Sequence, residues 1–171
     1  MSRKLARRRF LQSTSGLFAS MWVAGSQRIT FSQSPNEQIS VACIGVGGKG
    51  ISDASDAARY GNIVAICDID DNHLAAAAET YPNAQKFNDY REMFDTAAAK
   101  FDAVVVTAPD HHHAPAAVRA MRLGKHVYCQ KPLTHSVAEA RLMRDVANET
   151  GVVTQMGNQG TAADGFRASI E

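Results

Sequence analysis

Short apolar runs alternate with longer helical stretches from residue 38 to the end of the chain, and this alternation restricts the fold more than any other feature. The runs are rich in valine and isoleucine and lack polar alternation, which is typical of strands covered on both faces. Strands are predicted at residues 39–45, 62–68, 84–87, 102–108, 125–130 and 151–156. Strands separated by helices predict the α/β class, with a doubly wound parallel sheet.

The segments between the predicted strands have helical character. Helices are predicted within residues 74–81, 91–100, 114–124 and 136–151, and residues 165–171 resemble the first turns of another. The third and fourth of these have apolar residues three and four positions apart. They finish at Gly124 and Gly151, and glycine is common where helices end.

The first 26 residues are predicted to be an export signal. They contain five basic residues and no acidic one, and the run RRRFLQ precedes a short, moderately apolar stretch that ends in small residues. This arrangement resembles a twin-arginine signal peptide, which directs folded proteins to the periplasm or otherwise out of the cytoplasm. The alternative is a basic amphipathic start to a cytosolic protein. The apolar stretch is shorter than the roughly 20 residues that span a bilayer, so no stable membrane anchor is expected. Residues 27–37 are predicted to be a linker.

The charge of the remaining chain argues against a nucleic-acid partner. The whole chain has a net charge of +1, but residues 27–171 hold 13 basic and 17 acidic residues, a net charge of −4. A mildly acidic surface gives phosphate backbones no electrostatic attraction. The three cysteines are odd in number and lie in predicted strands, so they are interpreted as small buried apolar residues rather than a disulfide framework.

A glycine-rich turn, IGVGGKG, follows the first predicted strand and opens a helix. Its Gly45, Gly47 and Gly50 match the GxGxxG spacing of dinucleotide-binding turns. The first glycine permits a tight turn, the second lets the backbone approach a pyrophosphate, and the third lets the helix pack on the strand. Free N–H groups at the start of the helix attract the phosphates.

Asp68 ends the second predicted strand, 23 residues after Gly45. Its carboxylate is placed to accept hydrogen bonds from both hydroxyls of the adenosine ribose. The same carboxylate would repel a 2′-phosphate, and Ile69, Asp70 and Asp71 supply no compensating arginine. NAD(H) is therefore predicted over NADP(H). The alternative is an aspartate that only caps the next helix.

The stretch TAPDHHHAP, residues 107–115, closes the fourth predicted strand. Ligands of open parallel sheets bind at the carboxyl ends of strands, so Thr107 and Pro109 are predicted to line the cofactor crevice. Asp110 or His111 is predicted to start or cap the following helix. Three consecutive histidines also suggest a zinc site, but adjacent residues do not converge easily on one ion and no second ligand cluster stands out. No metal is predicted.

The stretch KHVYCQKPL, residues 125–133, places Lys131 directly after a buried strand and before Pro132. Proline fixes its own φ angle and favours an extended conformation for the residue before it. The ammonium group is thus held in one direction, which suits a catalytic site. The alternative is a lysine that merely closes the strand and pairs with a surface acid.

Taken in order, IGVGGKG, Asp68, TAPDHHHA and GKHVYCQKPL resemble the N-terminal domain of the Gfo/Idh/MocA oxidoreductases, over roughly residues 38–171. The resemblance implies a Rossmann-type NAD-binding domain at residues 38–156. It implies that Lys131 lies by the nicotinamide, where it contacts substrate or assists proton transfer, and that the bond before Pro132 is often cis. The family has a glutamate where this chain has Gln130. The predicted cofactor-binding residues are Gly45, Val46, Gly47, Gly48, Lys49, Gly50, Asp68, Thr107, Pro109, His113, Gln130 and Lys131.

The implied function is an NAD-dependent oxidoreductase acting on a small-molecule sugar or polyol, with Lys131 as the catalytic residue. Two alternatives stay open: an NAD-binding module without catalysis, and an NAD-dependent glycosidase of the same fold. The family's second domain carries the rest of the substrate pocket, and residues 157–171 are expected to begin a connection to such a domain. The present chain alone is expected to be inactive, and the full-length protein is expected to be a homo-oligomer.

Overall fold

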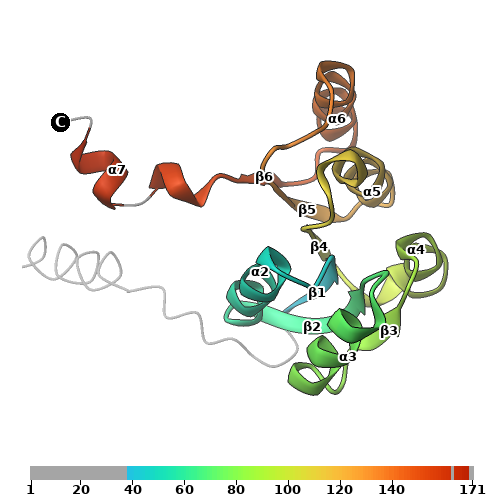
Figure 1. Ribbon diagram of the computed structural model, residues 1–171. Coiled ribbons are helices and arrows are strands. Elements are labelled where there is room, and N and C mark those ends of the chain that lie inside the picture. Colours follow the sequence, from blue (N-terminus) through green and yellow to red (C-terminus); the bar gives the residue numbers. More distant parts are fainter. Residues whose placement is uncertain (1–37, 163, 170–171) are drawn as a thin grey trace, which may run out of the picture. The chain divides into compact units, whose positions relative to one another are not determined.

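The computed structural model describes residues 38–162 and 164–169 (Figure 1). The predicted export signal at residues 1–26 and the predicted linker at residues 27–37 lie outside the described residues.

Six parallel strands form one sheet in the order β3-β2-β1-β4-β5-β6. All six predicted strands are present, and the predicted α/β class is confirmed. The largest difference is at β6, which begins three residues later than predicted because Gly151 still caps the preceding helix. The strands are β1 (Ile39–Ile44), β2 (Gly61–Cys67), β3 (Gln85–Phe87), β4 (Ala103–Val106), β5 (His126–Gln130) and β6 (Thr154–Gly157).

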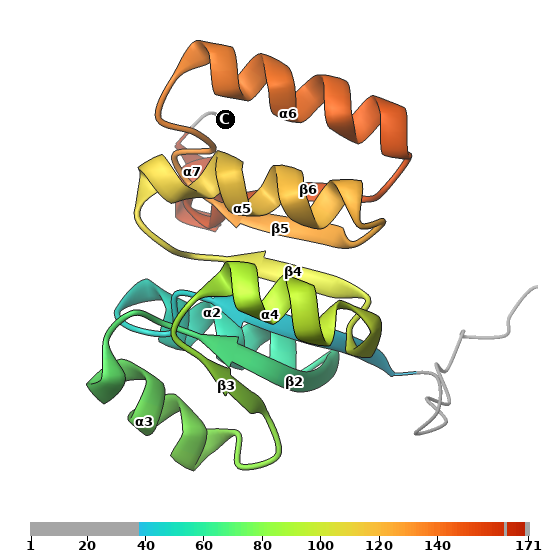
Figure 2. The ribbon, with the colours of Figure 1, turned by 90° about the vertical axis from the view of Figure 1, so that its right-hand side faces the viewer.

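Helices cover both faces of this sheet (Figures 1 and 2). Helices α2 (Lys49–Ala58) and α3 (Asp71–Thr80) pack on one face, whereas α4 (Tyr90–Ala97), α5 (Asp110–Arg122) and α6 (Val137–Thr150) pack on the other. Successive residues of a strand point to opposite faces, so each strand contributes to two apolar cores. The short elements η1 (Ala98–Lys100), η2 (Gln159–Ala162) and α7 (Asp164–Ala168) complete the described chain.

The helices begin and end at residues that satisfy their free backbone groups. The side chains of Asp70 and Asp89 accept hydrogen bonds at the starts of α3 and α4, and Ser136 forms a capping box with Glu139 at the start of α6. Gly151 ends α6 with a left-handed conformation, φ 67°. The predicted start of α5 is confirmed at Asp110.

The three cysteines are buried, as predicted, and none is in a disulfide. Burial raises the pKa of the Cys43, Cys67 and Cys129 thiols to about 12. Because the thiolate is the reactive form, these side chains behave as small apolar residues at neutral pH.

The glycine turn brings the backbone of the β1–α2 loop against two other segments. A Cβ atom on Gly45 would lie 2.7 Å from the backbone of Thr107 and Ala108, and Gly45 itself has φ 80°. A Cβ atom on Gly50 would overlap the carbonyl oxygen of Gly45. The turn therefore packs the start of α2 tightly against the carboxyl ends of β1 and β4.

The close approach at Gly50 predicts a large cost for one added methyl group. Gly50→Ala should lower the free energy of unfolding by about 3 kcal/mol, because the opposing group is backbone and cannot rotate away. Gly165→Ala is the matched control: it also lies in a helix, but no atom is within 4 Å of its Cβ position, so stability should change by less than about 1 kcal/mol. Urea unfolding followed by circular dichroism measures both, and equal effects would contradict the packing described for Gly50.

Candidate cofactor and catalytic site

A cavity of about 520 Å³ opens at the carboxyl ends of β1, β2 and β4. Strand order reverses here, because β1 is followed by β2 on one side while β4 lies on its other side. Ligands of doubly wound sheets bind at such a reversal. The cavity is lined by several of the predicted cofactor-binding residues, namely Gly45, Gly47, Asp68, Thr107 and Pro109.

The start of α2 leaves few backbone N–H groups without a partner. Gly48 precedes the helix with φ 51°, and Lys49 is its first residue. The N–H groups of Gly50 and Ile51 donate to the carbonyl oxygens of Gly47 and Gly48, so within the described residues those of Gly48 and Lys49 are the ones left for an anion. A Cβ atom on Gly47 would overlap the His73 ring on α3, so a larger residue at position 47 would displace this half-exposed side chain.

The Asp68 carboxylate is hydrogen-bonded to the backbone of the glycine turn. One carboxylate oxygen accepts the N–H groups of Val46 and Gly47 at 2.9 and 3.2 Å, and the other accepts the N–H of Asp70 at 3.0 Å. A carboxylate has about four acceptor positions, so these three bonds leave room for one more donor, such as a ribose hydroxyl. Asp68 thus shapes the turn and still faces the cavity.

The polar groups beside Asp68 bear on cofactor choice. The side chain of His73 lies 3.8 Å from the Asp68 carboxylate and 3.9 Å from that of Asp70. Among the described residues that line the cavity there is no lysine or arginine. Two carboxylates without a neighbouring guanidinium or ammonium group favour a ribose hydroxyl over a 2′-phosphate.

Asp53 on α2 is a buried carboxylate that the sequence analysis did not single out. Its side chain is 2% exposed, and it pairs with Lys49 at 2.7 Å. It also accepts hydrogen bonds from Thr107 at 3.2 Å, from Gln130 at 2.7 Å and from Gln159 at 3.3 Å. These partners lie on four different segments, so one carboxylate connects α2 to the carboxyl ends of β4, β5 and β6.

Gln130 connects Asp53 to the predicted catalytic residue. Its side-chain N–H donates to Asp53, and its side-chain oxygen accepts the backbone N–H of Lys131 at 2.7 Å. The Lys131–Pro132 bond is cis, which agrees with the expectation from the resemblance. Lys131 is exposed, and its ammonium group makes no hydrogen bond or ion pair within the described part of the chain. The alternative of a lysine paired with a surface acid therefore finds no such acid among the described residues.

His113 holds the same turn from the other side. Its ring is 2% exposed and lies between two carbonyl oxygens, with Nδ1 2.6 Å from that of Pro132 and Nε2 2.7 Å from that of Ala108. The ring donates to one of these oxygens when neutral and to both when it carries two protons. His113 thus connects the segment after β4 to the segment after β5.

The buried polar residues of the described chain all belong to this arrangement. They are Asp53, His113 and Gln130. Burial of polar groups is costly unless each is hydrogen-bonded, and no buried side-chain nitrogen or oxygen in the described residues lacks a partner. The buried polar side chains of the described residues therefore all support the backbone that carries Lys131.

The predicted site residues separate into two groups in the structure. Gly45, Gly47, Asp68, Thr107 and Pro109 line the cavity. The polar atoms of His113 and Gln130, which were predicted to bind cofactor, are bonded within the protein, so these two residues support the Lys131 turn from beneath. Asp53 was not predicted from the sequence. The signal that could have found it is its position four residues after Lys49, which places both side chains on one face of a helix.

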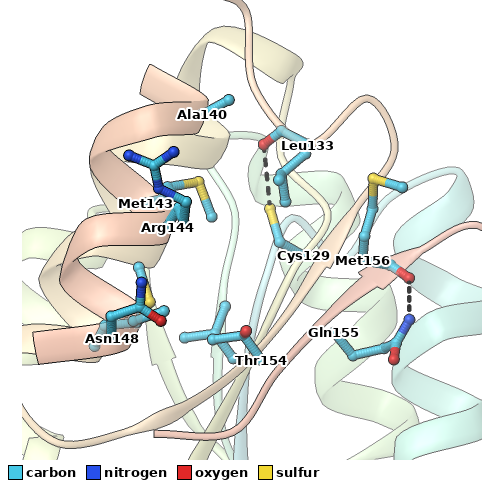
Figure 3. Close-up of a pocket in the computed structure, with 12 residues that line it drawn as sticks. Cys129, Leu133, Ala140, Met143, Arg144, Asn148, Thr154, Gln155 and Met156 are labelled. Carbon is cyan, nitrogen blue, oxygen red and sulfur yellow. Dashed lines mark hydrogen bonds between the residues drawn. The ribbon is translucent and has the colours of Figure 1, made fainter. Parts of the chain in front are cut away.

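A second cavity, of about 310 Å³, lies between α6 and strands β5 and β6 (Figure 3). Its lining is mainly apolar, with Met143 from α6, Cys129 from β5 and Met156 from β6. The guanidinium group of Arg144 at its rim is paired with Asp145 at 2.7 Å. This cavity offers no arrangement of acid and base groups for chemistry.

Two kinds of feature, a membrane-spanning helix and a metal-holding cluster, are absent from the residues that the structure describes. Within them, no helix is both long and apolar enough to cross a membrane. Nor do those residues bring together three or more histidine, cysteine, aspartate or glutamate side chains in a way that could hold a metal ion.

Curated proteins with similar sequences include dehydrogenases of inositol and of a glucoside. The chain is 31% identical over 90 residues to inositol 2-dehydrogenase of Salmonella typhimurium, which covers 52% of this chain and 26% of that protein. It is 36% identical over 91 residues to D-glucoside 3-dehydrogenase of Escherichia coli, which covers 53% of this chain and 25% of that protein. The chain thus spans about a quarter of the length of these relatives.

Solved structures show the same fold. The myo-inositol 2-dehydrogenase of Lactobacillus plantarum superposes with a TM-score of 0.71 at 27% identity, over 77% of this chain and 40% of that one. The scyllo-inositol dehydrogenase of Lactobacillus casei, solved with NAD(H) and scyllo-inositol, gives a TM-score of 0.70 at 22% identity, over 77% of this chain and 39% of that one. The family model for Gfo/Idh/MocA, described as an oxidoreductase family with an NAD-binding Rossmann fold, matches residues 39–158. The chain belongs to the Gfo/Idh/MocA oxidoreductases and carries their NAD-binding Rossmann domain.

Proposed function

We propose that this chain is the cofactor-binding part of an NAD-dependent oxidoreductase that acts on a sugar or polyol. The observation that carries the proposal is Lys131: an exposed ammonium group, without a partner in the described residues, on a turn held by buried hydrogen bonds. The inositol and glucoside dehydrogenases among its relatives support a polyhydroxylated substrate.

The proposed role of Lys131 is to position the reacting hydroxyl. Bound NAD supplies the hydride acceptor or donor, and the ammonium group orients the substrate oxygen and stabilises its developing negative charge. Because Gln130 and His113 fix the backbone on both sides of Lys131, little reorganisation is needed when substrate binds. The buried groups beneath the turn thereby contribute to the rate without touching substrate.

NAD(H) is the proposed cofactor in preference to NADP(H). Support comes from Asp68, which faces the cavity with one acceptor position left, and from Asp70 nearby. In the bound state the ribose hydroxyl would donate to Asp68, while the pyrophosphate would lie at the N-terminus of α2 near Gly48 and Lys49.

The substrate half of the site is proposed to lie in a second domain. Residues 38–156 form the NAD-binding domain in this proposal, and residues 157–171 begin the connection. Turnover then requires a longer form of the protein, which we propose is a homo-oligomer, and the present chain binds cofactor without turnover. The short coverage of the relatives supports this division.

Export through the twin-arginine route is proposed from the sequence of residues 1–26. Reduced, buried cysteines suit a protein that folds before it crosses the membrane, since this route carries folded proteins. The expected location is the periplasm or another compartment outside the cytoplasm.

Replacement of Lys131 should affect turnover and little else. In the longer form of the protein, Lys131→Ala should lower kcat by roughly 10²–10⁴-fold, the range for a positioned proton-transfer group. The melting temperature and the NAD affinity should stay nearly unchanged, because the ammonium group supports no other part of the described chain. Lys86→Ala, at an exposed lysine on β3, is the matched control and should leave turnover unchanged. Wild-type turnover of Lys131→Ala against inositols and glucosides would show that the lysine is structural.

The export proposal predicts a dependence on paired arginines. Residues 1–37 fused to a reporter should direct its transport, and replacement of Arg7, Arg8 and Arg9 by lysine should abolish it. All three are changed because the run leaves the register of the pair open. Transport that survives these changes, or that follows the general secretory route, would refute the proposal.

A further inference from the structure

We infer that Asp53 is a positioning residue for Lys131, and that Asp53 and Gln130 form a pair in which one member must be a carboxylate and the other an amide. The consequence for turnover rests on the function proposed for Lys131. The pairing itself rests only on the hydrogen bonds of the described chain.

The acceptor positions of Asp53 are fully used. One oxygen accepts from Lys49 and Gln159, and the other accepts from Thr107 and Gln130. Four donors match the roughly four acceptor positions of an ionised carboxylate. Because the side chain is 2% exposed, the loss of a donor leaves a buried oxygen with one partner fewer.

Gln130 needs both ends of its amide. Its nitrogen donates to Asp53 while its oxygen accepts from the backbone of Lys131. Gly157 on β6 leaves room for this amide, since a Cβ atom there would lie 2.7 Å from the Gln130 oxygen and 2.8 Å from the Tyr128 hydroxyl. The amide therefore has one orientation that satisfies both partners, and that orientation places the N–H of Lys131.

The pair accounts for an amide rather than a carboxylate at position 130 in this chain. With Asp53 in place, a glutamate there would set two carboxylates at the 2.7 Å distance now occupied by an N–H···O bond. They would repel each other or share a proton. If the carboxylate and the amide exchange positions, the amide nitrogen at 53 donates to the carboxylate at 130, which still accepts from Lys131, and the Thr107 hydroxyl turns to accept the second N–H of that amide.

Lys131 is the residue that this pair places. Its backbone N–H is held by Gln130, and the carbonyl of the next residue, Pro132, is held by His113. A change at Asp53 reorients the Gln130 amide and so moves the start of the turn. Asp53 acts on Lys131 only through Gln130, which is why it is a positioning residue.

The test compares the effect of Gln130→Glu on the melting temperature in the unchanged chain and in the Asp53→Asn variant, where the effect should have the opposite sign. At pH 8, Gln130→Glu should lower the melting temperature of this chain by roughly 10 °C, the scale for an uncompensated buried charge. In the Asp53→Asn background the same change should raise the melting temperature. Gln85→Glu is the control: it adds the same charge at an exposed residue on β3 that has no bond to Asp53, and it should cost less than about 3 °C. The comparison within the Asp53→Asn background decides the question even if Gln130→Glu alone does not fold.

The pH dependence of the melting temperature of Gln130→Glu shows whether repulsion between two carboxylates causes the loss. Two carboxylates that share a proton are less costly in acid, so the loss in Gln130→Glu should be smaller at pH 5 than at pH 8. The other titratable groups that face Asp53 are Lys49 on α2, Cys43 on β1 and Tyr128 on β5. Burial and the Asp53 charge raise the pKa of Cys43 to about 12 and also raise the pKa of Tyr128, so neither titrates between pH 5 and pH 8.

Two readouts follow Lys131 itself. In ¹⁵N-labelled chain, Asp53→Asn should shift the Lys131 amide resonance, whereas Gln85→Glu should not. In the longer form of the protein, Asp53→Asn should lower kcat by about 10-fold with little change in the KM for NAD, and the exchanged pair, Asp53→Asn with Gln130→Glu, should restore it.

The inference is overturned if Gln130→Glu changes the melting temperature in the same direction in both backgrounds, or if Asp53→Asn leaves the Lys131 resonance in place. These measurements need no turnover. A longer form that binds NAD but oxidises no sugar or polyol would refute the proposed function and leave the pairing untouched.

Discussion

Backbone contact at the glycine turn is the constraint on which the other features of this site depend. Gly50 lies against the carbonyl of Gly45, and Gly45 lies against the backbone of Thr107 and Ala108. No side chain fits between these segments. Their contact fixes the N-terminus of α2 over the carboxyl ends of β1 and β4, beside the cavity. It also brings Asp53, one turn into α2, within reach of β4 and β5.

From this contact the site extends by hydrogen bonds rather than by apolar packing. On one side, at the carboxyl end of β2, Asp68 accepts backbone N–H groups of the glycine turn. On the other side, Asp53 connects to Gln130 and through it to Lys131. One carboxylate in each half, the partly exposed Asp68 and the buried Asp53, therefore shapes a loop that is expected to meet cofactor or substrate. A buried, fully bonded group such as Asp53 fixes geometry at the cost of desolvation, which is the usual exchange at a functional site.

The sequence predicted the parts of this structure that depend on local pattern. Valine- and isoleucine-rich runs located most of the strands, the weak run AQKF located the short β3, and glycine spacing located the turn. Lys131 stood out because Pro132 follows it. Asp53 did not stand out, because three of its partners lie 54, 77 and 106 residues away in the chain. The same is true of His113, whose carbonyl partners are backbone groups that no side-chain pattern reveals. Long-range pairing of polar groups becomes visible only once the strands are placed side by side.

The central claim is that the cavity above Asp68 is an NAD site, and calorimetric titration of this chain with NAD⁺ and with NADP⁺ tests it most directly. NAD⁺ should bind more tightly, and Asp68→Ala should weaken its binding by roughly 1–3 kcal/mol, the loss expected for hydrogen bonds to a charged acceptor. Asp56→Ala, which removes an exposed carboxylate elsewhere on α2, should leave both affinities unchanged. Equal affinities for the two cofactors, or tighter binding of NADP⁺, would contradict the account.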